Sequence, residues 1–158
     1  MNQQHCQDSA ALSEAIQPIL SAASYLITEP AQLANYQLNC EGSAQQPRLV
    51  VSIGSEDDIA AVLKLAVSVS QSARPFSVHP ISTGRNWGYA SARANDASAV
   101  ILDLSRLNTI NCDNATLGIF TVGPGVTQQQ LRDYLNQQQL KFMVPVTGAG
   151  PGCSILGN

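Results

Sequence analysis

Residues 80–92 read Pro-Ile-Ser-Thr-Gly-Arg-Asn-Trp-Gly-Tyr-Ala-Ser-Ala, and the other predicted elements are arranged around this loop. Its glycines let backbone N–H groups turn toward one point and let a ligand approach closely. Ser82, Thr83 and Asn86 add short polar side chains, and Arg85 adds a positive charge. These residue types are typical of a loop that wraps an anion such as phosphate, although ordinary surface turns have the same composition.

The composition limits the class of protein. A chain of 158 residues corresponds to one domain or to part of a larger one. Charged residues make up 12% of it, the net charge is −3 and no basic run occurs, so we expect no nucleic-acid partner. The first residues lack the basic and apolar regions of a secretory signal, and no apolar stretch reaches the ~18 residues of a membrane span. We therefore expect a soluble, cytoplasmic protein.

No metal-binding pattern occurs in the sequence. The four cysteines are scattered and form no Cys-x-x-Cys pair: Cys6, Cys40, Cys112 and Cys153. The two histidines, His5 and His79, do not complete a ligand set. We predict four buried thiols, no metal site, and a core or strand-edge position for His79.

Two regions of different composition are predicted. Apolar residues at helical spacing indicate a helix over residues 9–27, kinked or split at Pro18, followed by a loop over 28–47 that contains at most one short helical turn. A shift in composition near residues 44–47 suggests a boundary. We assign residues 1–46 to an N-terminal helical arm and linker, and residues 47–158 to the main domain.

The main domain reads as alternating strands and helices. Strands are predicted over 48–53, 74–80, 99–104 and 118–122, with a polar link over 105–114 and an extended segment over 142–146. Helices are predicted after Ser55 and after Thr127, each with a capping-box partner three residues on, Asp58 and Gln130. The first helix joins two strands in a βαβ unit, which is right-handed if its strands are parallel.

Four motifs occur in a characteristic order. They are residues 81–89 (ISTGRNWGY), 101–108 (ILDLSRLN), 122–127 (VGPGVT) and 152–158 (GCSILGN). Together they resemble the FAD-binding domain of the vanillyl-alcohol oxidase/p-cresol methylhydroxylase flavoprotein family, over residues 47–158. The resemblance implies an α+β, p-cresol methylhydroxylase-type (PCMH-type) FAD-binding fold. Its C-terminal part and the substrate domain would lie beyond the second loop.

The resemblance also implies a set of FAD contacts in two loops. Its members are Ser82, Thr83, Gly84, Arg85, Asn86, Trp87 and Gly88 in the first loop, and Gly148, Gly152, Ser154, Gly157 and Asn158 in the second. Residues 123–126 match a structural turn, and Asp103 is interpreted as a strand-terminating, turn-bonding residue. Family members with histidyl-linked FAD often carry His in the first loop, where this chain has Asn86 or Trp87. We therefore expect no covalent link there, and we interpret Cys153 as a packing residue.

The implied function is FAD binding in an FAD-dependent oxidoreductase. The flavin would accept a hydride from an alcohol, phenolic or hydroxy-acid substrate, and oxygen or another acceptor would reoxidise it. No catalytic residue is assigned. The expected partner is a small-molecule substrate, and a homo-oligomer of the longer parent stays open. The alternative is a non-catalytic remnant or interaction module that keeps part of the fold. We expect residues 1–158 alone to be poorly soluble or partly unfolded, to bind FAD weakly and to be inactive.

Overall fold

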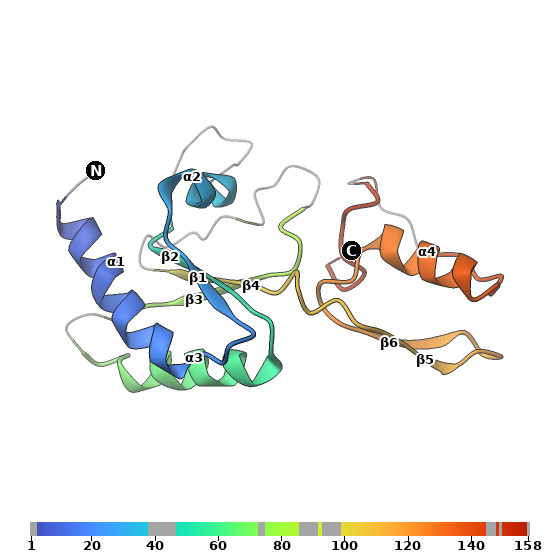
Figure 1. Cartoon of the computed structure of the whole chain (residues 1–158), viewed down its shortest axis with the longest axis horizontal. Helices are drawn as coiled ribbons and strands as arrows, with labels where there is room; N and C mark the ends of the chain where they lie inside the picture. Colours follow the sequence, from blue (N-terminus) through green and yellow to red (C-terminus); the bar gives the residue numbers. More distant parts are fainter. Residues whose placement is uncertain are drawn as a thin grey trace.

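The computed structural model describes residues 3–37, 47–72, 75–85, 92, 99–144, 148 and 150–157. These residues form two lobes, which lie left and right in Figure 1. The elements of the larger lobe are α1 (Gln3–Ile16), η1 (Gln17–Ile19), β1 (Tyr25–Ile27), α2 (Pro30–Leu33), η2 (Ala34–Tyr36), β2 (Leu49–Ser52), α3 (Glu56–Ser68), β3 (Val78–Ile81) and β4 (Val100–Asp103). Those of the smaller lobe are β5 (Ile110–Asn114), β6 (Ile119–Val122) and α4 (Gln128–Gln137).

A four-stranded mixed sheet forms the centre of the larger lobe, in the order β1-β2-β4-β3. Strands β2, β4 and β3 are parallel, and β1 pairs with β2 in the antiparallel direction, with Leu26 opposite Val51. Every residue of β2 is buried, as expected of a central strand covered on both faces. The parallel strands therefore end at the same edge of the sheet, where Ser82 follows β3.

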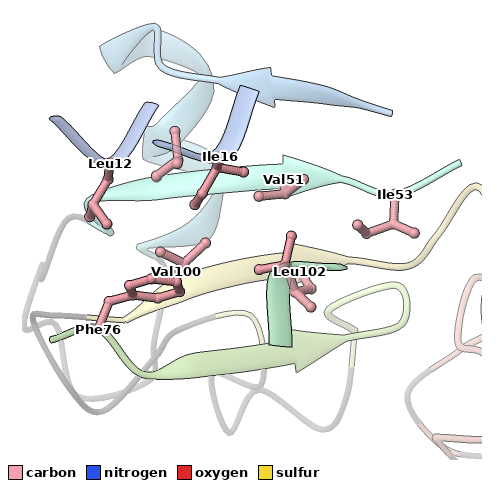
Figure 2. Close-up of a cluster of buried hydrophobic side chains, with 9 residues drawn as sticks. Leu12, Ile16, Val51, Ile53, Phe76, Val100 and Leu102 are labelled. Atoms are coloured by element: carbon pink, nitrogen blue, oxygen red, sulfur yellow. The ribbon is translucent and has the colours of Figure 1, made fainter. Parts of the chain in front are cut away.

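Helices cover both faces of this sheet (Figure 1). On one face, α1 and α3 pack on alternate residues of β2 and β4, in a cluster that Figure 2 shows as sticks: Leu12, Ile16, Leu49, Val51, Ile53, Val62, Phe76, Val100 and Leu102. On the other face α2 supplies Leu33, which packs with Val50 and Ile101. Successive side chains of β2 and β4 point to opposite faces of the sheet, so these strands contribute to two separate hydrophobic layers.

The smaller lobe is a β-hairpin covered by one helix (Figure 1). β5 and β6 pair in the antiparallel direction, and α4 packs Leu131 and Leu135 against them, together with Val126. The helix begins at the predicted capping box, because Thr127 Oγ1 accepts from Gln130 N and Gln130 Oε1 accepts from Thr127 N. This capping prediction is confirmed.

Three predictions of secondary structure need correction. The arm is not helical to residue 27: α1 ends at Ile16, η1 contains Pro18, and β1 follows as a strand. The polar link over 105–114 contains the strand β5. Asn and Asp residues in β5 hide the alternation of apolar and polar residues that would predict a strand. The loop predicted over 28–47 contains two short helices, α2 and η2, where at most one helical turn was expected. Residues 142–144 of the predicted extended segment form no strand, which leaves that prediction untested, and residues 145 and 146 lie outside the described part.

The start of α3 is built differently from its prediction. Ser55 occupies the N-cap but makes no side-chain cap. The backbone N–H of Asp58 donates to Ser55 O at 3.2 Å, but the Asp58 side chain does not complete a capping box. The Asp58 carboxylate instead accepts from Ser21 N at 2.8 Å, Ser21 Oγ at 2.7 Å and Ser24 Oγ at 2.5 Å. Burial alone would raise the pKa of Asp58, but these hydrogen bonds outweigh it and lower the pKa below its usual value. Asp58 therefore anchors the N-terminal arm to α3.

Within the described residues, no helix is both long and apolar enough to cross a bilayer. The same part of the chain holds no cluster of three or more His, Cys, Asp or Glu side chains suited to a metal ion. Cys153 is buried as predicted, whereas Cys112 on β5 is only half-buried; the side chains of Cys6 and Cys40 lie outside the described part. His79 is half-buried on the edge strand β3, in agreement with its prediction.

Candidate functional site: two loops between the lobes

The first loop begins where β3 ends. Leu104 N donates to Ile81 O at 2.9 Å, which holds the start of the loop beside the end of β4. Gly84 has φ of +65°, and a Cβ there would lie 2.9 Å from the Cβ of Ala92. Glycine is required at this position for both reasons.

One side chain of the first loop has an unused polar atom. Thr83 Oγ1 is buried and finds no hydrogen-bond partner within the described part of the chain. An unpaired buried hydroxyl costs about 1–3 kcal/mol relative to a bonded one. A ligand with hydrogen-bonding oxygens would remove that cost, so the loop fits a phosphate-bearing cofactor.

The second loop is attached to the start of α4. Gln128 N donates to Cys153 O and Gln129 N donates to Pro151 O, both at 3.0 Å, and Ile155 N donates to Val126 O at 2.8 Å. Helix N-termini leave N–H groups without intrahelical partners. In α4 these N–H groups donate to carbonyl oxygens of the second loop and to the Thr127 side chain. The start of α4 therefore holds the second loop in place, and these N–H groups are not available to bind an anion.

The two loops meet through serine and glycine. Ser82 Oγ and Ser154 Oγ lie 2.7 Å apart, and Gly157 N donates to Ser154 Oγ at 3.1 Å. A Cβ at Gly157 would lie 2.8 Å from Ser154 Oγ and 3.2 Å from Ser82 Oγ. The absence of a side chain at Gly157 therefore lets the two loops approach each other.

Arg85 lies across the second loop. A Cβ at Gly152 would lie 2.8 Å from a terminal guanidinium nitrogen of Arg85, and Cys153 Sγ contacts Arg85 O at 3.4 Å. The Arg85 side chain is exposed, so its charge is open to a ligand between the lobes. Cys153 is 2% exposed and packs in this contact, in agreement with its interpretation as a packing residue.

A polar contact that the sequence did not predict supports the end of β4. Tyr36 Oη donates to Asp103 Oδ2 at 2.7 Å, and Ser105 N donates to Asp103 Oδ1 at 2.9 Å. Burial, followed by the bond to Asp103 and its charge, raises the pKa of Tyr36 well above its usual range. The turn-bonding role predicted for Asp103 is confirmed. Tyr36 was missed because no local pattern links two residues 67 positions apart.

The structure brings together five of the residues predicted to contact FAD: Ser82, Arg85, Gly152, Ser154 and Gly157. Thr83 and Gly84 are in the same loop as Ser82, and Gly148 lies in an exposed turn. Asn86, Trp87, Gly88 and Asn158 lie outside the described residues. The predicted role of all twelve in holding FAD stays a prediction.

Comparison with known families identifies this arrangement. Residues 47–158 match the sequence model of a protein family described as "FAD binding domain". The chain therefore belongs to this family of FAD-binding domains. The range begins at the residue where the sequence resemblance begins.

Individual relatives and structures agree with this assignment. The chain is 36% identical over 109 residues to 1'-carboxy-chondrochloren decarboxylase of Chondromyces crocatus. It is 31% identical over 133 residues to the flavoprotein subunit of 4-cresol dehydrogenase (hydroxylating) of Pseudomonas putida. These matches span 69% and 80% of this chain, but only 19% and 25% of the two relatives.

Two solved structures resemble the whole chain. A substrate-bound p-cresol methylhydroxylase matches with a TM-score of 0.78 at 25% identity, and this chain spans 30% of it. A 4-ethylphenol oxidase from Gulosibacter chungangensis in complex with isoeugenol matches with a TM-score of 0.77 at 23% identity, and the chain spans 29% of it. The expected α+β, PCMH-type fold is confirmed, including the helix that precedes it.

Proposed function

We propose that the two loops hold the pyrophosphate and ribityl side of FAD, in a protein that oxidises a small phenolic or related alcohol substrate. The observation that carries the FAD assignment is the meeting of the loops at Ser82 and Ser154, 2.7 Å apart and bordered by Gly152 and Gly157. A ligand spanning both loops would contact backbone N–H groups with no Cβ in the way.

Individual residues are assigned roles in this site. Thr83 Oγ1, which is buried and unpaired within the described residues, would hydrogen-bond a phosphate oxygen. The exposed guanidinium of Arg85 would balance phosphate charge beside Gly152. Ser82 and Ser154 would keep the two loops at a fixed separation.

Other residues support the site without touching the cofactor. The hydrogen bonds from Gln128 and Gln129 would hold the second loop on α4, and Asp103 would fix the turn after β4. FAD, when bound, would supply hydride-accepting chemistry, and the protein would bind and orient it. The phenolic substrate class is proposed from the names of the 4-cresol dehydrogenase subunit and the 4-ethylphenol oxidase.

Ligand selectivity tests the FAD assignment. A protein that joins this chain to the remaining domains of the parent is titrated by calorimetry with FAD, ADP and riboflavin, because we expect residues 1–158 alone to bind FAD weakly. If the loops hold the pyrophosphate, FAD and ADP should bind saturably, with riboflavin far weaker, because riboflavin has no phosphate. Riboflavin binding as well as FAD, or an absence of saturable FAD binding at millimolar concentration, would contradict the assignment.

The reaction is tested separately on a protein that joins this chain to the remaining domains of the parent. Anaerobic flavin bleaching is followed with 4-alkylphenols, a hydroxy acid and a carboxylated phenol, the last because one relative is named a decarboxylase. Bleaching by the 4-alkylphenols supports the proposed substrate class. Bleaching only by the hydroxy acid, or by none of them, refutes it.

A further inference from the structure

A groove of about 370 Å³ runs along one side of α4. Its described lining residues are Gln128, Gln129, Arg132, Leu135, Asn136, Phe142, Met143, Val144 and Pro151. The volume falls within the range of small-molecule sites, about 300–1,000 Å³. The groove touches the second loop at Pro151, but its described lining includes neither Ser82 nor Ser154. It is therefore distinct from the proposed FAD site.

Gln128 provides an unused hydrogen-bond donor at this groove. Gln128 is 5% exposed, and its Nε2 is itself buried and has no partner among the described residues. By contrast, Nε2 of the neighbouring Gln129 donates to Asp133 Oδ1 at 2.8 Å. A buried amide without an acceptor is unfavourable, and an oxygen of a ligand in the groove would satisfy it once the amide turns toward the groove. The backbone N–H of Gln128 donates to Cys153 O, which fixes the residue in position.

The charge beside this donor favours an anion. Arg132 follows Gln128 by four positions, so both lie on the same side of α4. Arg132 is the charged residue among the described lining; Asp133 is not part of that lining, and its carboxylate accepts from Gln129 Nε2 at 2.8 Å. A carboxylate placed between Gln128 and Arg132 would therefore meet donors and no acidic side chain of the described lining.

The rest of the groove is apolar and partly rigid. Phe142 packs edge to face on Phe120 with ring centroids 6.2 Å apart, and its ring fills the space beside Gly118. Leu135 from α4 and Val144 belong to the same apolar cluster of the smaller lobe. An aromatic ring would lie between these side chains with its carboxylate toward Gln128.

We propose that this groove binds a small aromatic carboxylate. The carboxylate accepts from Gln128 Nε2 and pairs with Arg132, and the ring packs against Leu135, Phe142 and Val144. The pairing uses one buried donor and one exposed charge, so Gln128 contributes more of the affinity than Arg132. The site adjoins the second loop, but its described lining includes none of the predicted FAD contacts.

Two probes and three variants of the protein that joins this chain to the remaining domains of the parent test the proposal. The probes are phenylacetate and its uncharged analogue 2-phenylethanol, followed by ligand-observed NMR and by the Gln128 side-chain amide resonance. The variants are Gln128→Leu, Arg132→Gln and the control Lys64→Gln, which neutralises an exposed residue on α3.

Phenylacetate should bind more tightly than 2-phenylethanol and shift the Gln128 amide resonance. Gln128→Leu should weaken phenylacetate binding about tenfold without lowering the melting temperature, since it removes an unpaired donor. Arg132→Gln should weaken it about threefold, and Lys64→Gln should have no effect. FAD affinity should not change in Arg132→Gln or Lys64→Gln, so the two sites are assessed separately with these two variants.

Three results would overturn the proposal. The first is no phenylacetate binding at 10 mM, or equal binding of the two probes. The second is a Gln128→Leu variant that melts at a lower temperature and binds the probe normally, which would make Gln128 a structural residue. The third is an equal loss of affinity in Lys64→Gln, which would show nonspecific attraction to positive charge.

Discussion

Replacement of Thr83 by Val tests whether the Thr83 hydroxyl binds a ligand or stabilises the fold. The two side chains have nearly the same shape, and Thr83 Oγ1 is buried without a partner among the described residues. Removing an unpaired hydroxyl relieves up to about 1–3 kcal/mol of desolvation cost. A gain of 1 kcal/mol raises the melting temperature of a chain of this size by about 2–4 °C. We therefore expect Thr83→Val to melt at the same or a higher temperature without cofactor.

FAD binding should change in the opposite direction. A hydrogen bond to a charged phosphate contributes about 1.5–3 kcal/mol, which corresponds to about tenfold to a hundredfold in the dissociation constant. Calorimetric titration of FAD and thermal melts with and without FAD measure the two effects on one sample. The matched control is Thr121→Val, because Thr121 Oγ1 donates to Asp113 Oδ2 at 2.6 Å in the hairpin. The Thr121→Val variant should lose some stability, because it lacks this hydrogen bond, and should keep its FAD affinity. A Thr83→Val protein that is destabilised and binds FAD normally would refute the assignment.

The remaining predictions concern the anchor of the arm and the contact between the loops. Asp58→Asn should lower the unfolding free energy at pH 7 by about 3 kcal/mol, because three hydrogen bonds to a buried carboxylate are weakened. The folded pKa of Asp58 is lowered, so this stabilisation is full above about pH 4 and disappears as the pH falls through the folded pKa. Urea unfolding from pH 7 to pH 2.5 should show this loss in the unchanged protein and in the exposed-site control Asp57→Asn, but not in Asp58→Asn. Gly157→Ala should weaken FAD about tenfold, since its Cβ would displace Ser154 Oγ; an unchanged calorimetric affinity would count against the proposed contact. In a variant whose other three cysteines are replaced by Ser, the Cys153 thiol should react with Ellman's reagent only on unfolding, because Cys153 is 2% exposed; rapid labelling of that variant in the native state would disprove this.

Local patterns predicted much of the fold. The β-branched runs of β2 and β4, and the Thr127–Gln130 capping box, carry their signals within a few residues, so their positions were found from the sequence. β5 was missed because Asn111, Asp113 and Asn114 suggest a loop when the partner strand is unknown. Pairing with β6 overrides that local preference.

The contacts between distant segments could not be read from the sequence. Asp58 looked like a helix-capping residue, and only the fold shows that Ser21 and Ser24 take its oxygens. The predicted FAD residues were found as two separate glycine-rich loops, and the distance between Ser82 and Ser154 follows from the attachment of the second loop to α4. A sequence motif predicts which residues belong to a loop, but tertiary packing determines which loops meet.

Strand β1 protects the central sheet from edge-to-edge pairing with another copy of the protein. β1 lies outside the family match at residues 47–158, yet it forms the antiparallel neighbour of β2. Without it, β2 would present unpaired backbone N–H and C=O groups next to four buried apolar or small side chains. Such an edge is a template for pairing with another copy. The arm that Asp58 holds in place therefore keeps β1 on the edge of β2. Protonation of the Asp58 carboxylate would favour aggregation as well as unfolding.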